Sequence, residues 1–180
     1  MFRDFFDKSC WGLLAVALTA LLAVLLVDAA NRDGKSARGS NKAMEREMAY
    51  HARVELINKL YGPVEVLRTA GRNQEALLKL DELNRRYPGE AHGHILQGLI
   101  LQDMGAPDEA IASFVEGIKL NGDYVDDKSP LSRRREIQGL VDIRSKDVSA
   151  RVAANPDNRT LAGLLQKTNY LKSRLAGGCE

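Results

Sequence analysis

Cysteine and tryptophan are almost missing from this chain, which has two cysteines and one tryptophan among its 180 residues. Cys10 and Cys179 stand near opposite ends, so sequence neighbours cannot build a disulfide framework or a cysteine-rich metal cluster. The excess of positive over negative residues is also small, because the formal net charge is only +2. A field strong enough to gather nucleic acid is therefore not expected, and nucleic acid is not a predicted partner.

Residues arranged for catalysis or cofactor binding are missing as well. The chain has three histidines, and on a helix His92 and His94 would point their rings about 200° apart, so they cannot share a metal ion. The sequence has no glycine-rich phosphate loop and no strained nucleophile motif. We therefore predict no enzyme activity, no cofactor, no metal and no small-molecule substrate.

One long hydrophobic run is present, from Trp11 to Val27, and none of its residues is charged. As a helix it would extend ~25 Å, close to the thickness of the hydrocarbon core of a bilayer. It predicts a single transmembrane helix at residues 11–27 after an N-terminal tail at residues 1–10, with the cleavable leader of a secreted protein as the alternative. Small side chains recur at every fourth position, where a second transmembrane helix could pack or where the spacing could be chance: Ala15, Thr19 and Ala23.

Residues 28–42 are polar, contain Gly and Ser and lack apolar periodicity, which predicts a flexible linker. More Lys and Arg follow the hydrophobic run than precede it. The positive-inside rule then favours a cytoplasmic domain, although domains of this size can be exported regardless of flanking charge. Residues 43–180 show helical patterns almost throughout, without strand alternation. The predicted fold class is all-α, with a transmembrane helix before a helical domain.

Interruptions in the helical region recur with a step of 34 residues, which relates Gly71 to Gly105 and Ala76 to Ala110. A repeated step of this length predicts pairs of antiparallel helices. The glycine is expected in the turn within each pair, and the alanine where two helices approach most closely.

This pattern resembles the tetratricopeptide repeat family. Residues 91–124 carry the resemblance best, through Gly98, Leu101, Ala110, Phe114 and the stretch MGAPDEAIASF, and residues 57–90 keep Ala76, Leu80 and Pro88. The chain departs from the family signature at His94, Gln97, Gly117 and Gly122. The resemblance implies a short α-solenoid. Pro63 falls inside the expected first helix of residues 57–90, where it predicts a break.

Beyond residue 124 only the spacing of the repeat persists, at Gly139 and Pro156, while the other signature residues are lost. Residues 125–180 are predicted to form either a degenerate third repeat or C-terminal capping helices, each with one apolar stripe.

The first helices of the family line a concave groove that binds peptides or proteins, and the resemblance implies such a groove here. Its lining would be Tyr61, Glu65, Arg68, His92, Ile95, Leu99, Gln102 and Asp103. A second candidate surface is the basic run Arg133, Arg134 and Arg135, which could contact anionic lipid or an acidic partner, or could be an ordinary solvated helix face.

These features predict a membrane-anchored scaffold or adaptor that binds a partner protein and supports a membrane-associated complex. The partner would be another membrane protein or its soluble domain, and the lipid bilayer would be contacted through residues 11–27. Bacterial proteins of similar layout act as assembly factors, which implies a single-pass protein of the bacterial inner membrane. The alternatives are a constitutive small structural subunit of a larger membrane complex and an enzyme with an unrecognised site.

Overall fold

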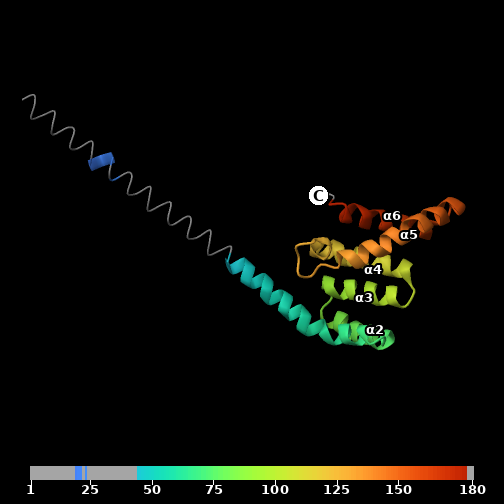
Figure 1. Ribbon diagram of the computed structural model, residues 1–180, viewed down its shortest axis with the longest axis horizontal. Coiled ribbons are helices and arrows are strands. Elements are labelled where there is room, and N and C mark those ends of the chain that lie inside the picture. Colours follow the sequence, from blue (N-terminus) through green and yellow to red (C-terminus); the bar gives the residue numbers. More distant parts are fainter. Residues whose placement is uncertain (1–18, 22, 24–43, 178–180) are drawn as a thin grey trace, which may run out of the picture. The chain divides into compact units, whose positions relative to one another are not determined.

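The computed structural model describes residues 19–21, 23 and 44–177, and the elements bounded within them are all helices (Figure 1). The chain divides into two units, Met1–Ala52 and Arg53–Glu180. In the first unit, residues 19–21, 23 and 44–52 are helical. The second unit starts with a helical segment, residues 53–69, and continues with α2 (Asn73–Arg86), α3 (Ala91–Asp103), α4 (Pro107–Leu120), the 3-10 helix η1 (Gly122–Val125), α5 (Arg134–Ala154) and α6 (Arg159–Leu175).

No helix in the described part of the chain is both long and apolar enough to cross a membrane. This finding contradicts the predicted transmembrane helix, and the predicted single-pass placement in a bacterial inner membrane is wrong with it. A spanning helix needs about 20 consecutive apolar residues, whereas α5, with 21 residues, buries one face and exposes charged residues on another. Thr19 and Ala23 are exposed helical residues. Ala15, most of residues 11–27, the tail and the linker lie outside the described residues.

Helices of the second unit repeat along the chain with the step seen in the sequence. α4 begins and ends 34 residues after α2. The turn before each of these helices contains a glycine with positive φ, Gly71 at 74° and Gly105 at 76°. Side chains disfavour this backbone conformation, so glycine is the residue that ends one helix and allows the next to fold back. α2, α3 and α4 consequently lie in successive layers (Figure 1).

Small residues determine how closely these layers approach. Ala76 and Ala110 are both fully buried, as is the ring of Phe114. On α3, a Cβ atom added at Gly98 would lie 2.6 Å from two ring carbons of Phe114 on α4, closer than real side chains pack. Gly98 therefore lets the Phe114 ring lie directly against the backbone of α3.

The predicted break at Pro63 is wrong, because residues 53–69 are helical without interruption. An interior proline removes one backbone donor and costs a helix about 3 kcal/mol. Tyr61 and Val64, on either side of it, are both completely buried. Burial of two such side chains contributes about 3 kcal/mol or more, which is enough to hold the helix together across the proline.

After α4 the chain departs from the repeating step. η1 and irregular turns at residues 126–133 stand where the first helix of a third repeat would begin, and α5 starts only at Arg134. α6 packs against both α5 and α4. Asn158 caps α6, its side chain accepting hydrogen bonds from two backbone amides of the first turn. α5 and α6 thus follow α4 without keeping the 34-residue step that relates α4 to α2.

Candidate functional site

The predicted groove on the first helices is closed in the structure. Tyr61 and Ile95 have no exposed surface, Leu99 is 2% exposed and His92 is 3% exposed. These four side chains are core residues and cannot line an open groove, so this part of the prediction is wrong. The resemblance implied an open face at these positions, but other parts of the chain cover the four side chains.

An aromatic cluster explains how the face is closed. His92 Nδ1 lies 2.9 Å from Tyr124 Oη, and the His92 ring centroid lies 4.9 Å from that of Tyr61 and 5.7 Å from that of Tyr124. Tyr124 belongs to η1, so the segment after α4 packs over α3 and residues 53–69. Burial, with the charge of Arg133 nearby, lowers the pKa of His92 from 6.5 to about 4. His92 is therefore neutral near pH 7 and shielded from solvent, which suits packing better than proton transfer.

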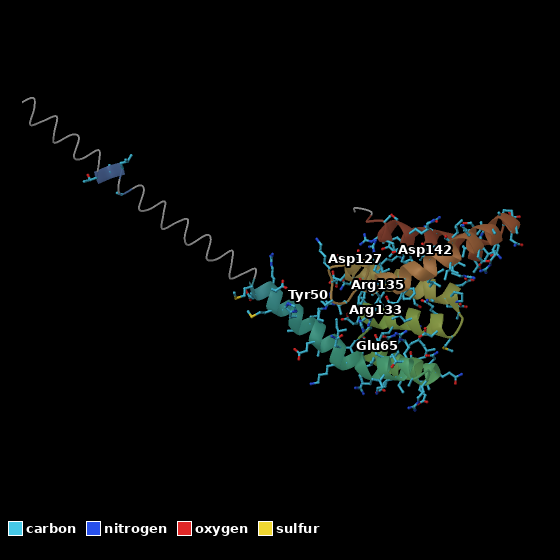
Figure 2. The ribbon with its side chains drawn as sticks, viewed as in Figure 1. Tyr50, Glu65, Asp127, Arg133, Arg135 and Asp142 are labelled. Carbon is cyan, nitrogen blue, oxygen red and sulfur yellow. The ribbon has the colours of Figure 1, made fainter. Side chains whose placement is uncertain are left out.

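The polar residues of the predicted groove form a chain of ion pairs. Arg133, just before α5, lies 2.6 Å from Glu65, and Figure 2 labels both residues. Glu65 is also 3.4 Å from Arg68, and Arg68 lies 2.9 Å from Asp103. Gln102 is half-buried beside them. Because the charges of Glu65, Arg68 and Asp103 are already paired within the chain, they offer a partner little uncompensated charge.

The basic run at the start of α5 is mostly used inside the molecule. Arg134 donates to the backbone oxygen of Val125 at 2.8 Å and to that of Leu175 at the end of α6. Arg133 binds Glu65 as described, and Arg135 is exposed. Two of the three arginines therefore fasten the irregular segment to its neighbours. The run does not form a continuous surface for lipid headgroups or for an acidic partner.

An open pocket of about 460 Å³ lies between α4, α5 and α6, and we call it the α4–α6 pocket. Asp108, Glu109 and Ala112 line it from α4, Arg151 from α5, and residues between Arg159 and Lys167 from α6. None of the residues predicted for the groove is among them. This pocket was not predicted from the sequence, because its residues come from three helices and meet only when α6 folds back onto α4.

Some charged residues of the α4–α6 pocket form ion pairs within the chain, and others do not. Asp108 accepts hydrogen bonds from Arg144 at 3.0 Å and Arg151 at 2.7 Å. Burial opposes ionisation of Asp108, but these two guanidinium groups keep the pKa of its carboxyl below the usual value. Arg159 and Lys167 line the same pocket and have no carboxylate partner among residues 44–177. The pocket thus combines one neutralised acid, Asp108, and one exposed acid without a described partner, Glu109, with two cations that form no described ion pair.

Apolar side chains contribute the rest of the pocket surface. These side chains are Ala112, Leu161 and Leu164, and apolar groups make up most of the exposed lining. An apolar surface beside a few charged groups is the usual composition of a ligand pocket in proteins. These two features make the α4–α6 pocket a candidate ligand site.

Neither metal chemistry nor a known family assigns the pocket. Within the described ranges, no group of three His, Cys, Asp or Glu side chains is placed to hold a metal ion. Comparison of the chain with protein-family models and with curated proteins finds no match. The function of the pocket is therefore inferred from the chemistry of its lining residues.

Proposed function

We propose that this chain is a helical-repeat scaffold of the tetratricopeptide type that binds a partner protein, with the α4–α6 pocket as its binding site. The observation that carries the proposal is the pocket itself, about 460 Å³ in volume, with an apolar surface and free cations. Its size falls in the range of roughly 300 to 1,000 Å³ in which proteins bind ligands or anchoring side chains. One inserted side chain of a partner would be desolvated there, as interface anchors are.

Three kinds of structural feature support the tetratricopeptide type of repeat. The helix bounds repeat after 34 residues, the turn glycines have similar φ values, and Ala76 and Ala110 are buried at equivalent places. Proteins built from such repeats contact others through surfaces spread over neighbouring helices, so a binding role agrees with this architecture.

Photo-crosslinking tests the proposed site. A benzophenone amino acid at Leu161, which lines the pocket, should give a discrete crosslinked adduct in cells that express the chain. The same amino acid at Ile143, 76% exposed on α5 and outside the pocket, is the matched control. Filling the pocket by Ala112→Trp should abolish the Leu161 adduct without changing the helical circular dichroism. Equal adducts at both positions, or none at Leu161, would contradict the proposal.

A further inference from the structure

The pocket's charges indicate the chemistry of its ligand, an inference that rests on the proposed function. Asp108 is neutralised by two arginines, at 3.0 and 2.7 Å, and so does not compete for other cations. Arg159 and Lys167 line the pocket and form no ion pair with a described carboxylate. Lys167 is half-buried, where a charge without a partner is unfavourable and an incoming anion would relieve the cost, whereas Arg159 is exposed and only adds positive charge at the pocket edge.

The start of α6 adds to this preference. The first turn of α6 contains no acidic residue, and its first residue is the cation Arg159. The partial positive charge of a helix N-terminus favours a nearby anion and disfavours a cation. A carboxylate placed beside Arg159 would therefore interact favourably with both the guanidinium group and the helix end.

The other side of the pocket restricts where the carboxylate can lie. Glu109 lines the pocket from α4, is exposed, and has no described cation partner. It would repel a second carboxylate brought close to α4. Ala112, Leu161 and Leu164 supply the apolar surface. The favoured occupant thus carries an acid on its α6 side and an apolar group beside it.

We propose that the α4–α6 pocket binds a short acidic segment of the partner protein. An aliphatic or aromatic side chain of that segment packs on Ala112, Leu161 and Leu164, and an adjacent Asp or Glu pairs with Arg159 and Lys167. A rim of charge around an apolar anchor gives both specificity and affinity that depends on salt.

A selection from a random peptide library tests this inference on the full-length chain. Peptides enriched on the wild-type protein should contain Asp or Glu next to a large apolar residue. A synthetic copy of the enriched peptide, followed by fluorescence anisotropy, should lose about tenfold or more in affinity with the double variant R159E/K167E, a loss of about 1.4 kcal/mol. Binding should also weaken as salt rises.

The matched control reverses two other positive charges. R135E/K146E makes the same change in net charge at two exposed residues outside the pocket. Affinity for the selected peptide should stay within about twofold in this control, because the pocket is unchanged. An equal loss in both double variants would show a general effect of charge and would overturn the inference.

The outcomes separate this inference from the proposed function. One such outcome would be enriched peptides that are neutral or basic, fail to bind Ala112→Trp and bind R159E/K167E as tightly as wild type. This result would refute an acidic ligand but would still support the α4–α6 pocket as the binding site. Failure to enrich any peptide that Ala112→Trp blocks would count against both. Self-association in sedimentation that R159E/K167E abolishes would assign the pocket to a second copy of the chain, and would overturn the inference.

Discussion

Mild acid should destabilise this protein through His92. The side chain is 3% exposed between two tyrosines, and burial, with Arg133 nearby, lowers its pKa from 6.5 to about 4. Between these two pH values the unfolded chain binds a proton that the folded chain does not bind. The stability that His92 contributes is thus complete above about pH 6.5 and is lost as pH falls towards 4.

The size of the effect follows from the width of that window. One pH unit inside it changes the free energy of unfolding by about 1.4 kcal/mol. Between pH 7 and pH 5 the expected loss is about 2 kcal/mol for a single group, which is a large part of the stability of a small domain. The salt-bridged carboxyls of Glu75 and Glu82 have pKa values below 4.5, so they stay ionised above pH 5.

Urea unfolding at fixed pH steps measures this slope. His92→Asn removes the imidazole and should flatten the decline between pH 7 and pH 5, whatever its stability at pH 7. His94→Asn, at a half-buried position two residues away, is the matched control and should keep the wild-type slope. Equal slopes in wild type and His92→Asn, or a His92 imidazole that titrates near pH 6.5 by NMR, would show that burial of His92 does not cause the loss of stability in acid.

Three further changes test the packing. Gly98→Ala should cost roughly 1 to 3 kcal/mol in chemical unfolding because the new methyl group meets the Phe114 ring; Gly139→Ala, where a Cβ has open space on α5, is the control and should be neutral or slightly stabilising. Leu99→Asp should lower Tm or prevent folding, because it places a carboxylate at a site that is 2% exposed; an unchanged melting curve would show that Leu99 is not core. Arg133→Ala should cost about 1 kcal/mol, since its pair with Glu65 is only half-buried. A double-mutant cycle that shows no coupling between Arg133 and Glu65 would contradict that last prediction.

Local signals in the sequence were enough to locate most of the helices. Gly71 and Gly105 lie in the turns between them, and both adopt the positive φ that a side chain disfavours. Ala76 and Ala110 are buried as their spacing indicated. Pro63 was misjudged because its cost is local, whereas the burial of neighbouring residues that outweighs it depends on distant helices.

Site residues could be assigned to a helix face but not to the surface of the molecule. The family resemblance placed Tyr61, His92 and Leu99 in the lining of a groove, yet a resemblance in the repeat pattern carries no information on what covers that face. Tyr124, the last residue of the better-matching repeat, and Arg133, which lies beyond it, cover this one. Neither residue is at a signature position of the repeat, so the pattern did not indicate that the groove would be filled.

Capping, glycine conformation and apolar spacing act within one or two turns of the chain, so the local sequence was enough to set the helices, their turns and the 34-residue step. Which faces stay open depends on how distant helices pack against one another. The α4–α6 pocket exists because α6 packs back on α4, bringing Lys167 and Arg159 to the same space as Ala112. Contacts between helices far apart in sequence depend on the apolar surface buried over the whole fold. A local sequence pattern does not predict that total.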